Sequence, residues 1–406
     1  MGAESDPGRA ATAASEAASA PAKTLSSVLI DGDTAFAVWG ETPARRLARA
    51  FARTGLESFI GETEIDEATG DLIVLRSDIV LDAPVVSALA EARDVVLLST
   101  GPGKPEPVAA HVPAHRAREV LAVLRSGRLD DLPAGIGHAT SETLGSAYWH
   151  ALRKRETPYV LVLSPQTVAA AEWRMFMGTY KGATDFVTKW IWPRPAFAAT
   201  KLCARAGVSP NFVTAVSLVF VAAAFYWFLS GDWLLGLAAG WIMTFLDTVD
   251  GKLARVTLAS SKFGNFFDHS IDLIHPPFWY VAWGLGLAGG PLAYSRGELT
   301  ALLTIIVAGY VLQRLIEGAS IALFKLEIHV WRRIDTLFRQ VTARRNPNLV
   351  LLSVFAIAGR PDLGLLAVAL WTAVSLVLHG FQLLQAYLAW RRDGALTSWM
   401  AKPGAS

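Results

Sequence analysis

Carboxylates are concentrated in one short stretch of an otherwise apolar half of the chain. The stretch "DTVDGKLARVTLASSKFGNFFDHSID", residues 247–272, contains four aspartates: Asp247, Asp250, Asp268 and Asp272. Four unpaired carboxylates beside a lipid bilayer would repel one another and would be costly to dehydrate. Divalent cations relieve both costs, and an all-oxygen ligand set favours hard ions such as Mg²⁺, Mn²⁺ or Ca²⁺. We therefore expect a pair of divalent ions, Mg²⁺ or Mn²⁺, at this stretch.

The spacing of these residues predicts two helix faces that meet. The first face contains positions i, i+3, i+4 and i+7, namely Asp247, Asp250, Gly251 and Ala254. The second face contains positions i, i+4 and i+8, namely Gly264, Asp268 and Asp272. Eight residues separate Arg255 from Gly264, which predicts an antiparallel helical hairpin whose four carboxylates converge at one depth.

The residue types around the carboxylates favour a diphosphate ligand. Arg255 supplies a positive charge beside the expected metals, and the small Gly251 and Ala254 leave room for a ligand to approach the backbone. Two other interpretations exist: the carboxylates line a water-filled cation path, or they pair with arginines. Neither of them requires this spacing of glycine and arginine.

The same residues resemble a known signature at every fixed position. CDP-alcohol phosphotransferases, also called CDP-alcohol phosphatidyltransferases, share the pattern D-x2-D-G-x2-A-R-x8-G-x3-D-x3-D, which residues 247–272 match. The upstream "SPNFVT", residues 209–214, resembles the P-N-x-[VI]-T stretch that opens the first membrane helix of that family. The resemblance extends over about residues 193–390 and implies six membrane helices, usually in a homodimer.

The resemblance also implies roles for individual residues. Asp272 would be the general base that deprotonates the acceptor hydroxyl before it attacks the β-phosphorus, and CMP would leave. The metal ligands would be Asp247, Asp250, Asp268 and Asp272. The binding site for the CDP group would comprise Asp247, Asp250, Gly251, Ala254, Arg255, Gly264, Asn211 and Thr214. A metal pair suits this reaction because it can neutralise the bridging oxygens and hold the attacking and leaving groups.

The two substrates are less well defined than the reaction. The resemblance implies a CDP-linked alcohol as donor, most commonly CDP-diacylglycerol, and a small or lipid alcohol as acceptor in phospholipid biosynthesis. Lys262 and Lys201 are candidates for binding an acceptor phosphate, although they could also attract anionic lipid headgroups. Arg314 pairs with Glu317 at i, i+3, either as an acceptor contact or as a tie between helices or subunits.

The connector over residues 175–195, "MFMGTYKGATDFVTKWIWPRP", has two interpretations. Its tryptophans and basic residues are typical of an anchor at the membrane interface. Alternatively, Lys181, Asp185 or Lys189 contributes directly to the mouth of the site. The following residues 193–207 mix apolar and basic side chains, which predicts an interfacial amphipathic helix. Ser209 and Pro210 then provide a cap and a first-turn proline for the next helix.

Apolar stretches in the second half predict an all-α membrane domain. Its six expected spans are residues 212–229, 234–255, 264–287, 299–324, 349–358 and 363–390. Arginines and a lysine crowd the loop between the fourth and fifth spans, whereas the loops on the other side are nearly uncharged. The positive-inside rule therefore places the active site and the amino-terminal domain on the cytoplasmic side of a membrane, expected to be the bacterial inner membrane.

The first half is typical of a soluble domain. Residues 1–24 lack the apolar core of a signal peptide and are expected to be a disordered tail. Across residues 25–170, β-like runs alternate with helical patterns, which predicts a Rossmann-like α/β domain with a parallel sheet. Residues 171–208 would be the linker and interfacial helix, residues 209–392 the membrane domain, and residues 393–406 a cytoplasmic tail. The single cysteine, Cys203, excludes an internal disulfide framework.

The order of the domains resembles that of family members with a fused cytidylyltransferase. The glycine-rich G-x-G-[ST]-R loop of such a domain is absent, and Asp78 is the remaining candidate for a metal-binding aspartate. We therefore expect a degenerate nucleotidyltransferase-like domain without catalysis, and a bifunctional enzyme of the inositol-phosphate type is the alternative. A membrane cation transporter is disfavoured because no carboxylate follows Asp272 in its helix. A net charge of +2 indicates no nucleic-acid partner.

Overall fold

The structure, a computed structural model, describes residues 26–101 and 104–402. The predicted disordered tail, residues 1–24, and the last four residues of the chain lie outside this part. The described residues form two compact units. The first comprises residues 26–33, 47–144 and 159–162, and the second comprises residues 34–46, 145–158 and 163–402.

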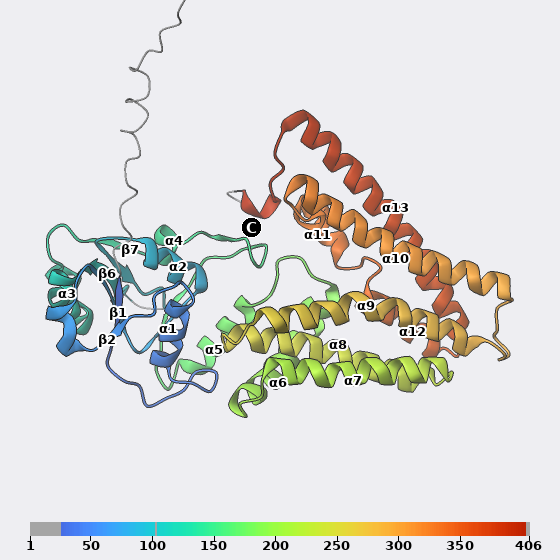
Figure 1. Ribbon diagram of the computed structural model, residues 1–406, viewed down its shortest axis with the longest axis horizontal. Helices are drawn as coiled ribbons and strands as arrows, with labels where there is room; N and C mark the ends of the chain where they lie inside the picture. Colours follow the sequence, from blue (N-terminus) through green and yellow to red (C-terminus); the bar gives the residue numbers. More distant parts are fainter. Residues whose placement is uncertain (1–25, 102–103, 403–406) are drawn as a thin grey trace, which may run out of the picture. The chain divides into compact units, whose positions relative to one another are not determined.

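A six-stranded sheet forms the centre of the first unit (Figure 1). Its strands lie in the order β2-β1-β3-β6-β5-β7. They are β1 (Ser27–Asp31), β2 (Phe59–Ile60), β3 (Asp71–Arg76), β5 (Val95–Leu98), β6 (Pro107–Pro113) and β7 (Gly137–Ala139). A separate pair joins β4 (Ile79–Leu81) to β10 (Val160–Val162) in antiparallel fashion. The prediction of an α/β unit is confirmed.

The prediction of a parallel sheet is wrong, because β6 runs antiparallel to both of its neighbours, β3 and β5. The other pairs in the sheet, β1 with β2, β1 with β3 and β5 with β7, are parallel. Only eight residues separate β5 from β6, which allows a hairpin but is too short for the crossover that parallel neighbours need. Strands that are buried on both faces have the same apolar composition in either direction, so their pattern could not reveal this reversal.

Helices cover both faces of this sheet. Residues of α1 (Pro43–Ala52) and α2 (Ala83–Glu91) pack against one face, in a core that includes Phe51 and Ile73. α3 (Ala117–Ser126) packs against the other face, in a core that includes Leu72 and Val74. Successive residues of β3 therefore alternate between the two cores, as the pleat of a strand requires. A short helix, α4 (Ser141–Leu144), follows β7.

Asp78, the candidate metal-binding aspartate of this unit, is held by an arginine. Its carboxylate lies 2.6 Å from Arg76, and the same guanidinium lies 3.2 Å from Glu106. Arg76 thus already compensates the negative charge of Asp78, to which a metal ion would otherwise bind. The structure thus gives this unit no feature that favours a metal at Asp78.

The second unit is mainly helical. Its helices are α5 (Val168–Gly178), α6 (Pro193–Arg205), α7 (Pro210–Leu229), α8 (Trp233–Val256), α9 (Lys262–Leu287), α10 (Arg296–Phe324), α11 (Arg333–Arg339), α12 (Arg345–Ile357) and α13 (Pro361–Asp393). Shorter elements are a hairpin of β8 (Tyr148–Trp149) with β9 (Lys154–Arg155), a π-helical turn at Val187–Ile191 and 3₁₀ turns at Ile328–Val330 and Trp399–Ala401. Ser209 caps α7 by accepting a hydrogen bond from the Phe212 N–H, so the predicted cap is confirmed.

Each of the six predicted membrane helices is present as a helix, α7 to α10, α12 and α13. Within the described residues, four of them are long and apolar enough to cross a membrane: α7, α8, α10 and α13. The other two depart from that pattern, since α12 has only 13 residues and α9 contains Asp268, Asp272 and two internal prolines. The prediction of a helical membrane domain is therefore supported, with four candidate spans rather than six.

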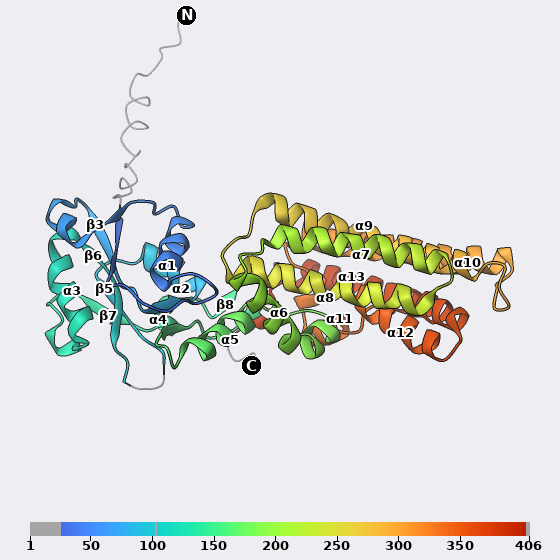
Figure 2. The same ribbon diagram turned by 90° about the horizontal axis from the view of Figure 1, so that it is seen from below.

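The helices enclose an aromatic core. α7 packs along both α8 and α9 (Figure 2), and Phe228, Trp279 and Trp283 lie buried among them. The Trp279 indole N–H donates to the Val221 carbonyl at 3.0 Å, and that of Trp283 donates to the Pro361 carbonyl at 2.9 Å. These bonds satisfy polar groups that have no water to bind in an apolar interior.

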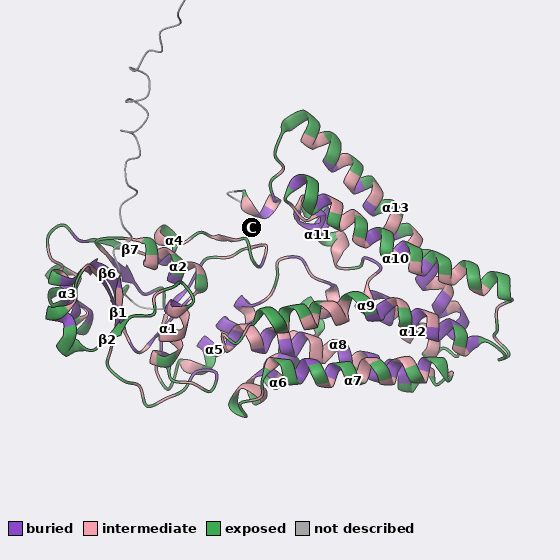
Figure 3. Ribbon diagram, in the orientation of Figure 1, coloured by how far each residue is buried: buried purple, intermediate pink, exposed green. Residues whose placement is uncertain are grey.

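Exposed residues lie along the outer faces of the helices (Figure 3), and many of them are large and apolar. Val219 on α7, Leu315 on α10 and Val377 on α13 are each more than 60% exposed. A water-soluble surface rarely presents so many large apolar side chains together. These faces suit contact with lipid.

Candidate active site

The signature residues lie at one end of a helical hairpin. The last three turns of α8 contain Asp247, Asp250 and Arg255, and α9 begins at Lys262 after a loop of only five residues. Ser261 caps α9 by accepting a hydrogen bond from the Gly264 N–H at 2.9 Å. The predicted antiparallel hairpin is present because the chain reverses within this short loop.

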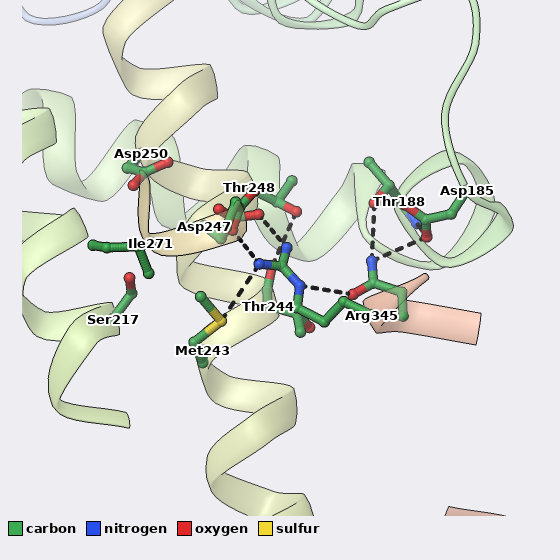
Figure 4. A network of polar contacts seen from close by, with 12 residues as sticks. Asp185, Thr188, Ser217, Met243, Thr244, Asp247, Thr248, Asp250, Ile271 and Arg345 are labelled. Carbon is green, nitrogen blue, oxygen red and sulfur yellow. Dashed lines mark hydrogen bonds and ion pairs between the residues drawn. The ribbon is translucent and has the colours of Figure 1, made fainter. Parts of the chain in front are cut away.

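Three of the four aspartates converge. Asp247, Asp268 and Asp272 each offer a carboxylate oxygen, and these three oxygens lie within 4.8 Å of one another. Asp250 is not part of this group, because its Oδ2 accepts a hydrogen bond from the Thr214 hydroxyl at 2.6 Å on α7. The expected convergence thus holds for three carboxylates, and Asp250 is instead held by Thr214 of α7. Figure 4 shows Asp250 apart from the contacts of Asp247 with Arg345.

The carboxylates fit a hard divalent cation. The second oxygen of Asp250, Oδ1, is buried and has no hydrogen-bond partner among the described residues. An unpaired anionic oxygen in the interior is unfavourable unless a cation compensates it. The three converging oxygens of Asp247, Asp268 and Asp272 offer the all-oxygen donor set that Mg²⁺ and Mn²⁺ prefer, and Asp250 adds a further buried carboxylate oxygen on the same helix as Asp247.

Arg345 lies between the carboxylates of the two helices (Figure 4). Its Nη2 is 2.5 Å from Asp247 Oδ2, and its Nη1 donates to Asp272 Oδ1. The guanidinium therefore compensates the negative charges of Asp247 and Asp272, which a bound divalent ion would also compensate. Sequence reasoning used Arg345 only as one member of the basic loop. Its place directly before "NPN", residues 346–348, could have indicated a residue with a structural role at the start of a helix.

The CDP-binding candidates lie close together around the start of α9. Arg255 Nη1 donates to the Gly251 carbonyl at 2.9 Å, so its guanidinium folds back along α8. A Cβ built on Gly264 would lie 2.6 Å from Asn211 Oδ1, so glycine at this position leaves room for the Asn211 side chain beside the start of α9. The "SPNFVT" stretch is thus brought next to the aspartate motif.

A cavity of about 580 Å³ opens beside the carboxylates. Signature residues in its lining are Asp247, Gly251, Arg255, Asp268 and Asp272. Of the three candidate acceptor residues, Arg314 lines it as well.

Lys201 and Lys262 do not belong to the lining of this cavity. Lys201 Nζ is instead 2.5 Å from Glu172 Oε2, and Lys262 is exposed at the first residue of α9. Proximity in sequence to the interfacial helix and to the hairpin suggested these two lysines. The structure does not bring these two lysines into the lining of the cavity, and their contact with an acceptor stays a prediction.

The far part of the cavity is rich in positive charge. Arg314 and Arg344 both pair with Glu317 Oε1, Arg314 at 2.8 Å, and His329 Nε2 lies 3.0 Å from the same oxygen. Burial lowers the pKa of His329 to about 3, so this imidazole is neutral. A third cation, Arg339, has a buried Nη1 without a partner among the described residues. Glu317, His329 and His379 could geometrically hold a metal, but two guanidinium groups on Glu317 favour an anion here instead.

The connector before α6 holds the start of α12 in place. Asp185 Oδ1 accepts hydrogen bonds from the Thr188 N–H and from Asn346 Nδ2, both at 3.0 Å, and its Oδ2 accepts one from the Thr188 hydroxyl at 2.8 Å. Asn346 directly follows Arg345, so Asp185 indirectly positions the guanidinium between the carboxylates (Figure 4).

Replacing this carboxylate should destabilise the protein. Asp185→Ala leaves the Thr188 N–H without its acceptor and leaves the buried Asn346 amide with only the Thr188 hydroxyl at 3.3 Å, where an unsatisfied buried group costs about 1–3 kcal/mol. We expect a lower midpoint of thermal unfolding in detergent. Asp393→Ala is the matched control, because Asp393 is exposed and pairs only with its neighbour Arg392. Equal unfolding midpoints for the two variants would contradict this role of Asp185.

Known proteins that resemble this chain agree with one another in the kind of enzyme that their names describe. Residues 207–377 match the family model described as CDP-alcohol phosphatidyltransferase. The archaetidylinositol phosphate synthase of Pyrococcus horikoshii is 34% identical over 90 residues, 22% of this chain and 46% of that protein. The phosphatidylinositol phosphate synthase of Streptomyces avermitilis is 31% identical over 111 residues, 27% of this chain and 43% of that protein. The chain thus spans less than half the length of each of these relatives.

Proposed function

We infer that this chain, whose residues 207–377 match the family model described as CDP-alcohol phosphatidyltransferase, is an integral-membrane enzyme of phospholipid biosynthesis. It transfers a substituted phosphate group from a CDP-linked alcohol to an acceptor alcohol and releases CMP. The observation that carries this proposal is the convergence of Asp247, Asp268 and Asp272 within 4.8 Å, in a cavity that also contains Arg255.

The residues of the site have complementary roles in this reaction. Asp272 takes the proton from the acceptor hydroxyl, whose oxygen then forms a bond to the β-phosphorus. The bond from that phosphorus to the bridging oxygen breaks, and its electron pair leaves with CMP. Arg255 holds the diphosphate through its guanidinium. Two divalent ions held by the four aspartates would supply charge neutralisation for the diphosphate and the leaving group.

The acceptor is proposed to be a phosphorylated polyol such as inositol 1-phosphate, and the donor CDP-diacylglycerol. Arg314, Arg339 and Arg344 gather at one end of the cavity, where Glu317 is the carboxylate that Arg314 and Arg344 share. This excess of positive charge suits a phosphate group. The names of both relatives given above describe synthases of inositol phosphate lipids, which supports the same class of acceptor.

We also propose the membrane placement and the assembly. Six helices would cross the bacterial inner membrane, with the site on the cytoplasmic side, and two copies of the chain would associate. The arginines at residues 332–345 support this orientation, since basic loops remain in the cytoplasm. The α/β unit would bind a nucleotide or regulate the enzyme without catalysing a reaction of its own.

Release of CMP by the purified protein tests the proposal. The protein in detergent is incubated with CDP-diacylglycerol, Mg²⁺ or Mn²⁺, and one acceptor at a time: inositol 1-phosphate, inositol, glycerol 3-phosphate or serine. We expect metal-dependent release with inositol 1-phosphate and much slower release with unphosphorylated inositol. Faster release with an uncharged acceptor would contradict the proposed acceptor class. Absence of release with every acceptor, from protein shown to be folded, would contradict the donor.

A further inference from the structure

One lysine in the cavity has no partner. Lys181, in the connector before α6, lines the same cavity as Asp268 and Arg255. Its Nζ makes no hydrogen bond or ion pair with any residue in the described part of the chain, and its side chain is exposed to the cavity. By contrast, Arg153, which reaches the cavity from the β8–β9 hairpin, is paired with Glu327 at 2.5 Å.

The backbone around Lys181 is firmly held. The next residue, Gly182, donates its N–H to the Leu152 carbonyl at 3.0 Å. A Cβ at Gly182 would lie 2.9 Å from Met400 Sδ, so the chain passes too close to its neighbours for a larger residue. Ala183 is buried against Val330 and Met400. These contacts, together with those of Asp185, fix the point from which the Lys181 side chain extends.

Positive charge outweighs negative charge around Lys181: the effects of Arg255 and Arg153 on its ammonium are larger than those of Glu327 and Asp268. The protein walls of the cavity and the positive charges of Arg255 and Arg153 lower the pKa of the Lys181 ammonium. Arg255 itself donates to a backbone carbonyl and forms no ion pair with a described carboxylate. Asp268 interacts with both Lys181 and Arg255, but neither cation forms an ion pair with it within the described residues. A phosphate group that binds both cations directly would compensate the remaining positive charge.

We propose that Lys181 binds a phosphate group of the substrate beside Arg255. Lys181 lies outside residues 207–377, so the connector adds a substrate ligand that the family-matched segment lacks. The inference rests on the proposed function, because it uses the same cavity. The phosphate belongs to the diphosphate of the CDP-linked donor or to the acceptor. Because Lys181 lines the cavity together with Arg255, we favour the diphosphate of the donor. The ammonium would stabilise the negative charge on the departing CMP.

Binding measurements on the full chain in detergent test this assignment. Lys181→Gln removes the charge at similar length, and Lys181→Arg restores a charge. Lys189→Gln is the matched control from the same connector, because Lys189 Nζ lies over the Trp190 ring and outside the cavity lining. The probes are CDP with Mg²⁺ and, separately, inositol 1-phosphate, with affinities measured by isothermal titration calorimetry.

We expect Lys181→Gln to weaken CDP binding at least roughly tenfold, as loss of a hydrogen bond to a charged group does, and Lys181→Arg to recover most of the affinity. Weakened binding of inositol 1-phosphate, with CDP unaffected, would assign the same contact to the acceptor phosphate. Wild-type affinity of Lys181→Gln for both probes would overturn the proposal. An equal loss of affinity in Lys189→Gln would also overturn it. The same holds if Lys181→Gln loses affinity together with a lower unfolding midpoint and Lys181→Arg does not restore that midpoint.

Binding without turnover separates this inference from the proposed function. A wild-type protein that binds CDP, but releases no CMP with any acceptor, would contradict the proposed reaction and leave the role of Lys181 supported by its own variants. A wild-type protein that binds neither probe would overturn both.

Discussion

Asp272→Asn should reduce CMP release by roughly 100- to 10,000-fold, the range typical of losing a general base. The amide retains an oxygen at the same place, but it cannot accept the proton of the acceptor hydroxyl. The variant should still fold, because the amide oxygen can accept the hydrogen bond that Arg345 donates to Asp272 Oδ1. The measurement is CMP release under single-turnover conditions, with the unfolding midpoint recorded in parallel.

Asp232→Asn is the matched control for this variant. Asp232 is exposed just before the first residue of α8, at the end opposite the signature, and its side chain caps nothing. We expect it to release CMP at the wild-type rate. If Asp272→Asn retained that rate as well, another group would have to take the proton, and the assignment of the base would be wrong.

Asp250→Asn should lower the activity without lowering the stability of the metal-free protein. Its Oδ1 is buried without a partner in the described residues, so in metal-free protein the negative charge is uncompensated. Neutralising it should leave the metal-free protein equally stable or more stable, by up to about 1–3 kcal/mol. Loss of a carboxylate ligand should at the same time lower CMP release by at least about 100-fold and raise the Mn²⁺ concentration needed for half-maximal activity.

Two measurements check this prediction. The first is CMP release as a function of Mn²⁺ concentration, and the second is thermal unfolding in EDTA. A structural role for the Asp250 carboxylate, through its bond from Thr214, would instead make the variant less stable in EDTA. Unchanged dependence on Mn²⁺ would show that Asp250 is not a metal ligand.

The sequence by itself determined the helical hairpin and the face on which its carboxylates lie. This was possible because helix periodicity is local: the spacing of Asp247, Asp250, Asp268 and Asp272 fixes their faces once both segments are helical. The short loop between α8 and α9 then leaves little freedom for the two faces to separate. The positions of the six predicted helices followed equally well from local composition, although only four of them are long and apolar enough to cross a membrane. The α/β character of the first unit followed from local composition as well.

Only the tertiary structure decided which distant residues join this site. Arg345 is 73 positions from Asp272, and Lys181 precedes the signature by 66 positions, so no spacing rule connects them. Their placement follows from packing between segments: Asp185 holds Asn346, and Gly182 holds the connector against Leu152. The direction of β6 and the bond from Thr214 to Asp250 were hidden for the same reason. A side chain has the same chemistry wherever it lies in the sequence, and only its neighbours in space decide whether that chemistry is used.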